Sequence, residues 1–158
     1  MHKSISFKNK IATFFLLMRS SLLYSNFDDA PVITASGKQA FCTESPMNIV
    51  TDFTITDADD TTIPAFFIQI SAGYQLNFDR LELSGNHPQI NSTWNANEGK
   101  LTLTSVVSGG EMLLSDLENA VKDVIFTTST TTIAEEKTFS LTIDDANYLP
   151  LTDHFYQF

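Results

Sequence analysis

Short apolar segments separated by turn residues constrain this chain more than any other feature of its sequence. From Ala30 onward these segments alternate with stretches rich in Gly, Pro, Asn, Asp and Ser. Strands of a β-sandwich recur in this rhythm, about every 8 to 12 residues. A period of two, which places apolar side chains on one face of a strand, is clearest in three sets: Phe66, Ile68 and Ile70; Leu101 and Leu103; and Phe139, Leu141 and Ile143. The sequence therefore predicts an all-β fold.

The predicted strands form one antiparallel β-sandwich with a single short helix. Ser115 and Glu118 have capping-box spacing, and apolar residues then recur at helical spacing up to Val124, which predicts the helix. The turn chemistry of NANEG at 95–99 predicts a hairpin between the strands on either side. The expected strands are 32–35, 47–56, 65–71, 79–84, 89–94, 100–106, 124–127 and 138–143.

The length of the chain favours a single domain. Its 158 residues, 42% of them hydrophobic, are enough for one core and too few for two comfortable ones. Cys42 is the only cysteine, so no disulfide forms within the chain and stability must come from packing. We expect the sandwich to occupy 26–150, since no internal repeat divides that region.

The first 25 residues have the pattern of a signal peptide. A basic stretch, MHKSISFKNK, leads into IATFFLLMRSSLLYS, which is apolar apart from Arg19 and several serines. The apolar run is shorter than the roughly 20 residues needed to cross a bilayer, and no later stretch approaches that length. The sequence thus predicts a leader at 1–25, no membrane span, and a protein that is secreted or located on the outer cell surface.

The charge of the chain argues against one class of partner. The formal net charge is -10, and Lys3, Lys8, Lys10 and Arg19 all precede residue 26, so the remainder is more acidic still. Nucleic-acid affinity comes largely from cationic side chains that displace counterions, so we expect no nucleic-acid partner. An acidic surface attracts divalent cations, although it can also serve solubility alone.

Two acidic clusters follow predicted strands and are candidates for a calcium site. The first comprises Asp57, Asp59 and Asp60, and the second comprises Asp144 and Asp145. If the two preceding strands run in the same direction, the clusters meet at one end of the sandwich. Calcium takes about six to eight oxygen ligands in irregular geometry, which these carboxylates could supply in part. The alternative is that they are solvated turn residues, which turns favour for local hydrogen bonding.

Catalytic motifs are absent from the sequence. It contains no GxSxG, HExxH, GxGxxG or P-loop pattern, so we expect no enzyme activity. Asp57 and Asp144 could in principle form a glycosidase pair, yet a sandwich of this size offers little cleft for a sugar ring. A carbohydrate-binding module is the stronger alternative, because Trp94, Tyr74 and Tyr148 could stack on sugars.

From 51 to 145 the chain resembles the cadherin-like repeats of large bacterial surface proteins. An ordered set of motifs carries the likeness: ITDADDTTIPAFFIQISAGY, FDRLELSG, STWNANEGKLTLTS, LSDLENAVKDVIFTTS and KTFSLTIDD. The resemblance implies an Ig-like, cadherin-like sandwich with calcium ligands at Asp57, Asp59 and Asp144. The Asp-x-Asn-Asp-Asn linker of cadherins is replaced here by DDAN from Asp144, so the implied site is partial. In cadherin arrays the ions lie between neighbouring domains.

A second likeness covers nearly the whole mature chain. The run from PVITASGKQAFC to DDANYLP and HFYQF is similar to the amino-terminal region of multidomain adhesins in gliding-type bacteria. In those proteins a C-type lectin-like domain follows and a type IX secretion signal ends the chain. The likeness implies that 151–158 begins a linker, and that the partners are neighbouring domains, cell-surface proteins or glycans. We therefore expect a non-catalytic adhesion or spacer module that binds Ca2+.

Overall fold

The structure is a computed structural model that describes residues 29–38, 40–41, 45–130, 136–144 and 156–157. Its elements are β1 (Val32–Ser36), β2 (Met47–Asn48), β3 (Asp52–Thr56), β4 (Thr62–Ile63), β5 (Ala65–Ala72), β6 (Asp79–Leu83), β7 (Ile90–Asn95), β8 (Lys100–Ser105), β9 (Met112–Leu113), α1 (Leu114–Lys122), β10 (Val124–Thr128), β11 (Thr138–Asp144) and β12 (Tyr156–Gln157).

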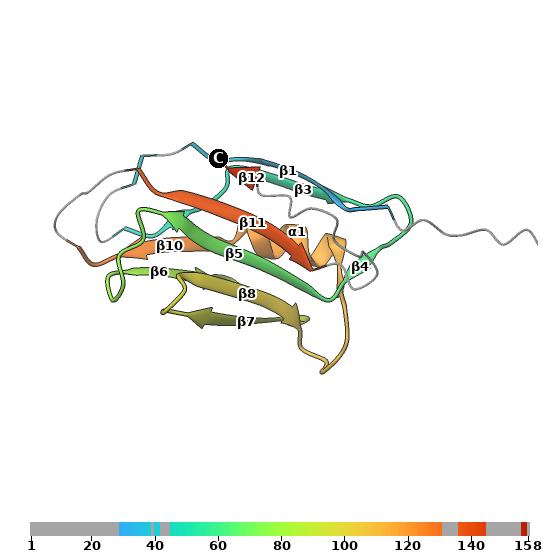
Figure 1. The fold of residues 1–158 in the computed structure, drawn as a ribbon. Helices are drawn as coiled ribbons and strands as arrows, with labels where there is room; N and C mark the ends of the chain where they lie inside the picture. Colours follow the sequence, from blue (N-terminus) through green and yellow to red (C-terminus); the bar gives the residue numbers. More distant parts are fainter. Residues whose placement is uncertain (1–28, 39, 42–44, 131–135, 145–155, 158) are drawn as a thin grey trace, which may run out of the picture.

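Antiparallel strands form the two layers of a sandwich (Figure 1). One layer is a five-stranded sheet with the order β12-β11-β5-β8-β7. The sheet β2-β10-β6 and the pair β1-β3 supply the strands on the other side of the core, and a small β4-β9 pair lies at one end. The predicted all-β antiparallel sandwich with one short helix is confirmed.

The period-two pattern explains which strand faces are buried. Phe66 and Ile68 in β5 and Leu103 in β8 are fully buried, as their alternation predicts. β11 follows the pattern less closely, because Leu141 is buried while its two apolar neighbours on that face are half-buried. Ser140 is buried as well, and it lies between Gln69 of β5 and Gln157 of β12 in the sheet.

Aromatic contacts join the two layers across the core. Phe53 of β3 packs edge-to-face on Phe66 of β5, with ring centroids 5.7 Å apart. Phe126 of β10 makes the same kind of contact with Phe139 of β11, also at 5.7 Å. Such pairs add about 0.5–1.5 kcal/mol each to the stabilisation that comes from burial alone. The layers are therefore held together by interlocking aromatic side chains.

The predicted strand 47–56 is wrong in one respect, because the structure divides it into β2 and β3. β2 pairs with β10, whereas β3 pairs with β1, so the chain changes sheet between them. At the change, the Ile49 N–H donates to the carbonyl of Val124 and the Thr51 N–H donates to that of Ser36. A continuous apolar pattern cannot reveal such a change of partner. The predicted β7–β8 hairpin is confirmed.

The helix α1 forms where helical spacing predicts it, but the predicted capping box is wrong. The residue before the helix is Leu113, which makes no side-chain cap, and Ser115 lies inside the first turn. Glu118 instead accepts the backbone N–H of Ile55 at 2.9 Å, which ties the helix to β3. A tertiary hydrogen bond has replaced the local one. The buried residues of the helix are Leu117, Ala120 and Val121.

The ends of the chain extend beyond the part that the structure describes. The expected leader at 1–25 lies outside it, and so does most of the expected linker at 151–158. Within that linker Tyr156–Gln157 pair with β11, so these two residues belong to the sheet. Among the described residues no helix is both long and apolar enough to cross a membrane.

Candidate functional site

The topology brings the described members of the two predicted acidic clusters to one end of the sandwich. Asp57 directly follows β3, and Asp144 ends β11, where it lies opposite Ala65 at the start of β5. The loop 57–60 leads through β4 into β5, so the loop and Asp144 lie at the same end. The two preceding strands thus run in the same direction, as the hypothesis required. We call this end the acidic pole; it comprises Asp29, Asp57, Asp59, Asp60 and Asp144.

Asp57 shapes the loop through its own side chain. Its Oδ1 accepts the backbone N–H groups of Asp59 and Asp60, each at 3.2 Å. Aspartate commonly closes turns in this way because the carboxylate replaces the strand carbonyls that the N–H groups have lost. One oxygen of Asp57 therefore has the local structural role that the sequence left open as an alternative.

Asp59 lies close to two other acidic residues. Its two carboxylate oxygens are 3.3 and 3.4 Å from the backbone nitrogen of Asp29, which donates to them. A hydrogen bond with the Asp57 carboxyl, together with desolvation, raises the pKa of Asp59 above its ordinary value of 3.8. Adjacent carboxylates disfavour each other's ionisation, and such a pair is eased by a shared proton or by a cation.

The acidic pole does not form a complete metal site within the described residues. No group of three or more His, Cys, Asp or Glu side chains there is arranged to hold a metal ion. Asp144 is exposed on its strand end, and Asp145 lies outside the described part. Because calcium needs about six to eight oxygens, most ligands would have to come from elsewhere. Calcium binding stays a prediction.

The aromatic candidates for sugar stacking lie near the end of β7. Trp94 packs edge-to-face on Tyr74, with ring centroids 6.2 Å apart, and the Tyr74 hydroxyl donates to the carbonyl of Ala96. Burial raises the pKa of the Tyr74 hydroxyl, and the charge of Asp79 adds to the effect. Tyr148 lies outside the described residues. A shallow groove beside Trp94 is lined by Asn77, Phe78, Arg80 and Ser129 among others.

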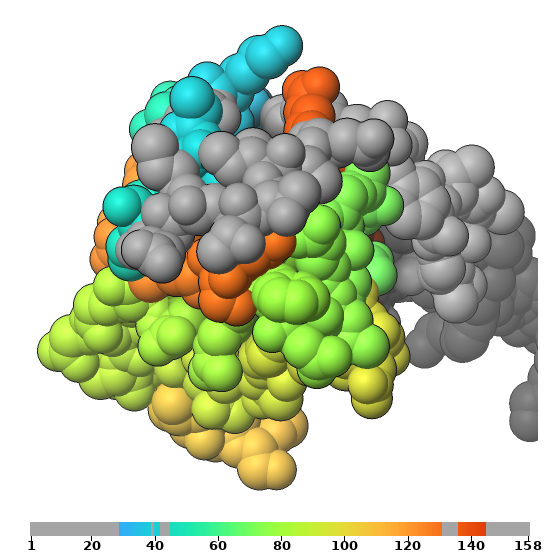
Figure 2. Space-filling view, turned by 90° about the vertical axis from the view of Figure 1, so that its left-hand side faces the viewer, coloured from blue at the N-terminus to red at the C-terminus, as the bar shows by residue number. Residues whose placement is uncertain are grey.

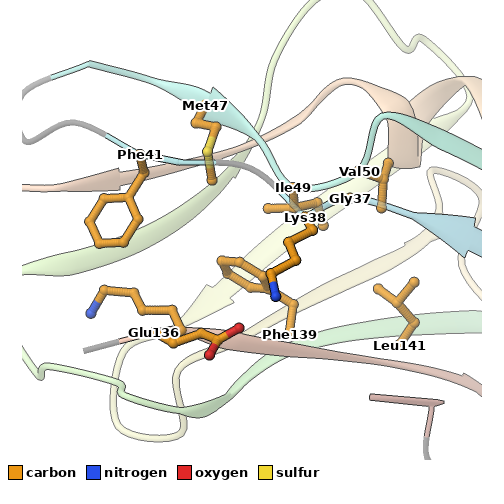
Figure 3. A pocket seen from close by; sticks show the side chains of 10 residues that line it. Gly37, Lys38, Phe41, Met47, Ile49, Val50, Glu136, Phe139 and Leu141 are labelled. Atoms are coloured by element: carbon orange, nitrogen blue, oxygen red, sulfur yellow. The ribbon is translucent and has the colours of Figure 1, made fainter. Parts of the chain in front are cut away.

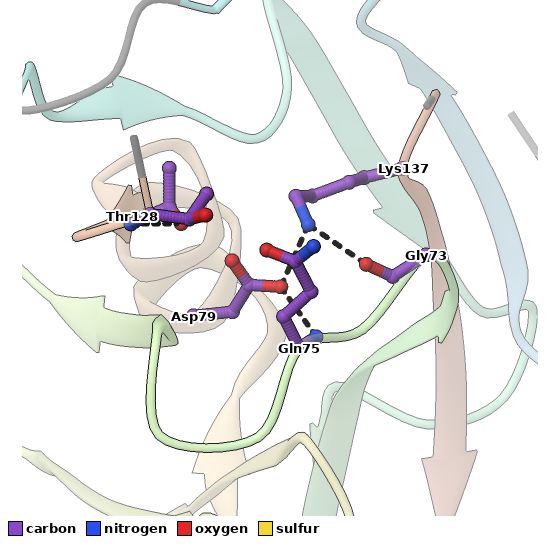
Figure 4. A network of polar contacts seen from close by, with 6 residues as sticks. Gly73, Gln75, Asp79, Thr128 and Lys137 are labelled. Carbon is purple, nitrogen blue, oxygen red and sulfur yellow. Dashed lines mark hydrogen bonds and ion pairs between the residues drawn. The ribbon is translucent and has the colours of Figure 1, made fainter. Parts of the chain in front are cut away.

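A buried ion pair that the sequence did not predict lies at the end of the molecule opposite the acidic pole (Figure 4). Lys137 Nζ is 2.7 Å from Asp79 Oδ2, and the two side chains are 3% and 0% exposed. The same ammonium donates to the carbonyl of Gly73 at 2.7 Å and lies 5.6 Å from the Phe126 ring centroid. Asp79 Oδ2 also accepts the backbone N–H of Gln75 at 2.7 Å. The pair thus joins the β5–β6 loop to the start of β11.

Figure 2 faces this end of the molecule, where green atoms of the β5–β6 region border orange atoms at the start of β11. Two buried acceptors beneath it, Asp79 Oδ1 and Gln75 Oε1, have no hydrogen-bond partner among the described residues. One oxygen of the Asp79 carboxylate, Oδ2, accepts hydrogen bonds from both Lys137 and the Gln75 N–H, while the other oxygen, Oδ1, accepts none among the described residues. The only sequence signal was a lysine beside an apolar strand in a lysine-poor chain.

A cavity of about 90 Å³ lies between β2 and β11 (Figure 3). Phe41, Met47 and Ile49 line one side of it, and Phe139 and Leu141 line the other. This volume has room for a few water molecules and is too small for a typical ligand pocket, which measures about 300–1,000 Å³. We interpret it as a packing gap rather than a binding site.

No protein-family model, curated protein or solved structure matches this chain. The cadherin-like and adhesin assignments therefore stay predictions based on the sequence motifs.

Proposed function

We propose that this chain is a non-catalytic adhesion or spacer module of a secreted or cell-surface protein. One observation carries the proposal: the described chain enters the sandwich at one end, and its last strand runs toward the other. Asp29 lies beside Asp59 at the acidic pole, whereas β12 pairs antiparallel to β11 and so runs away from Asp144. Modules with this path can be joined end to end, which suits a protein that extends from a surface.

The packing of the sandwich also supports a mechanical role. Aromatic pairs join the layers, and the buried Lys137–Asp79 pair braces them at the end opposite the acidic pole. The described pockets are a small cavity and shallow surface hollows, in contrast to the deep clefts in which most enzymes hold a substrate. We propose that neighbouring domains, surface proteins or glycans are the partners.

The proposed adhesion is tested with beads that carry the purified chain. The beads should adhere to the surface of cells that produce the protein. Purified chain added in solution should inhibit that adhesion. A substrate turned over by the chain, with turnover lost on Asp57→Asn, would instead make it an enzyme. The same beads coated with an unrelated acidic protein control for charge.

Calcium is proposed to bind at the acidic pole through Asp57, Asp59 and Asp144, with further ligands from a neighbouring domain or partner. A site with a Kd of about 0.1 mM would stabilise the fold by about 1.4 kcal/mol in about 1 mM calcium. That corresponds to a rise in Tm of about 3–5 °C. The rise should disappear in chelator and in Asp59→Asn, and persist in Glu82→Gln, which removes an exposed charge from β6. An unchanged Tm would show that this chain alone does not bind calcium at these residues.

A carbohydrate-binding module is the second candidate, favoured by the groove beside Trp94. Phe78, which lines that groove, is 51% exposed, and Asn77 and Arg80 offer hydrogen-bond donors next to it. Aromatic rings flanked by polar groups are the usual way to hold a sugar. A glycan array should then give hits that Phe78→Ser abolishes and that Val106→Ser, at an equally exposed apolar site elsewhere, retains. An array without hits would remove this candidate.

A further inference from the structure

β7 is an open edge of the five-stranded sheet. It pairs with β8 in an unbroken register from Ile90 opposite Ser105 to Asn95 opposite Lys100. In the part of the chain that the structure describes, no strand pairs with its other side, whereas the opposite edge of the sheet ends in the short β12. An edge strand presents a row of free N–H and C=O groups to any further strand.

This edge lacks the features by which sheets normally prevent association. β7 reads INSTWN, without a charged residue, proline or glycine, and Asn91, Ser92 and Thr93 are all exposed. The edge of the opposing sheet on the same side, β6, is different, because Arg80 and Glu82 are both more than half exposed on it. Charges on an edge strand discourage pairing, and β7 has none.

β7 itself carries no charge, and two of the acidic residues near its ends have partners within the chain. Glu98 pairs with Lys100 at the β7–β8 turn, and His87 Nε2 lies 3.0 Å from Asp123 Oδ2 near the start of the strand. Two copies of a chain with net charge -10 repel each other over most of their surfaces. β7 itself adds no charge to that repulsion, and a second copy offers an uncharged strand of the same kind, so we take a second copy of this chain as the occupant of this edge.

β1 is also uncharged, but its surroundings oppose self-pairing. Val32 at its start pairs with Thr56, beside the acidic pole, and Ser36 at its end pairs with Asp52. An antiparallel pair through β1 would bring the acidic pole of each copy toward Asp52 of the other. Like charges at both ends would then oppose the contact, whereas the residues of β8 that pair with β7 include no acidic residue.

We propose that two copies of this chain associate through antiparallel pairing of their β7 strands, which forms one continuous sheet across a two-fold axis. If the two-fold axis passes between the two Thr93 residues, Thr93 of one copy lies opposite Thr93 of the other. Asn91 of each copy then lies opposite Asn95 of the other copy. Cross-strand pairs of this kind form hydrogen bonds that stabilise sheets. Such a contact is isologous, so it closes after two copies.

The antiparallel arrangement also separates the acidic poles. β7 begins at the end of the sandwich where the acidic pole lies, because Ile90 pairs with the last residue of β8, and β8 ends beside the start of β5. In the pair, the acidic pole of one copy therefore lies level with the far end of β7 in the other copy. The strongest repulsion between the copies acts over the greatest available distance.

Sedimentation of the full chain over a range of concentrations tests the proposal. The chain should form a dimer at high concentration. Thr93→Lys and Thr93→Glu should each raise the dimer dissociation constant about tenfold or more, because like charges meet on the axis. An equimolar mixture of the two variants should regain the dimer, which a misfolded variant could not do. Thr54→Lys, the same change at an exposed position of β3, should leave the dimer unchanged.

Two outcomes would overturn the proposal. One is a chain that stays monomeric at every concentration. The other is association that Thr93→Lys leaves unchanged, which would place the contact on another surface. Neither outcome bears on the adhesive function proposed above, since beads can adhere to a different partner through a monomer.

Discussion

The buried Lys137–Asp79 pair allows a quantitative test of how the sandwich is held together. Lys137→Met keeps much of the side-chain volume but removes the ammonium that contacts Asp79 Oδ2 and the carbonyl of Gly73. Asp79 has a fully buried side chain, and its Oδ1 has no described partner. The variant therefore leaves a charge that is neither hydrated nor paired.

Removing one partner of a buried pair costs about 3–5 kcal/mol, because the remaining charge keeps its desolvation penalty. Domains have unfolding free energies of about 5–15 kcal/mol in total. Lys137→Met should therefore lower the Tm by roughly 6–20 °C, at about 2–4 °C per kcal/mol for a domain of this size. Lys100→Met, at the partly exposed Lys100–Glu98 pair, should cost only about 0–1 kcal/mol.

The double variant that combines Lys137→Met with Asp79→Asn distinguishes an ion pair from simple packing. The introduced asparagine would keep an acceptor for the Gln75 N–H, and its amide could donate to Gln75 Oε1, which has no described partner in the native chain. The double variant should therefore be more stable than Lys137→Met alone by about 2 kcal/mol. Urea unfolding followed by the fluorescence of Trp94, the only tryptophan, measures the stability of both variants. If the double variant were less than about 0.5 kcal/mol more stable than Lys137→Met, the reasoning would be refuted.

Three further outcomes are expected from the same unfolding assay. Gly99→Ala should lower the unfolding free energy by about 2–4 kcal/mol, because Gly99 has a φ of +64° and its new Cβ would lie 3.0 Å from the Tyr74 ring. Gly109→Ala should cost only about 1–2 kcal/mol, because Gly109 has a similar φ of +69° but no atom near the new Cβ. Equal costs would contradict a steric contact at Gly99. Glu118→Ala should cost about 1–3 kcal/mol by leaving the Ile55 N–H without its acceptor, and a neutral effect would show that water replaces it. Asp59→Asn should be more stable than the native chain at pH 7, because folding raises the pKa of Asp59 and its ionised form therefore destabilises the folded state. This gain in stability should vanish below about pH 3.8, where Asp59 is protonated in both the folded and the unfolded chain. A gain that stayed the same at every pH would point to another cause.

The strands could be predicted because each buries one face, and a buried face requires an apolar residue at every second position of the sequence. Phe66, Ile68 and Leu103 therefore lie where their alternation places them. The change of sheet at 49–51 could not be predicted in this way, because apolar residues continue through it and only the partner strand differs. Periodicity predicts that one face of a strand is buried, but it does not predict which strand pairs with it.

The candidate sites show the same division between local and tertiary information. The acidic pole was predictable because Asp57 follows a strand and Asp144 ends one, and strand direction then decided whether they lie at the same end. The Lys137–Asp79 pair was not, since its two residues are far apart in the chain and each alone looks like an ordinary surface residue. The capping-box prediction failed for a related reason: Glu118 bonds to β3, which local spacing cannot reveal.

Taken together, the proposed function and the proposed β7 pair imply contact between chains on opposing surfaces. The described chain enters at the acidic pole, and β12 leads toward the opposite end. In an antiparallel β7 pair these two ends exchange places, so two copies that were each attached by the same end would be held on opposing surfaces. A parallel pair would anchor both copies on one surface, but it would set the two acidic poles side by side, and the net charge of -10 on each chain opposes that arrangement. The charge distribution thus favours bridging over lateral clustering.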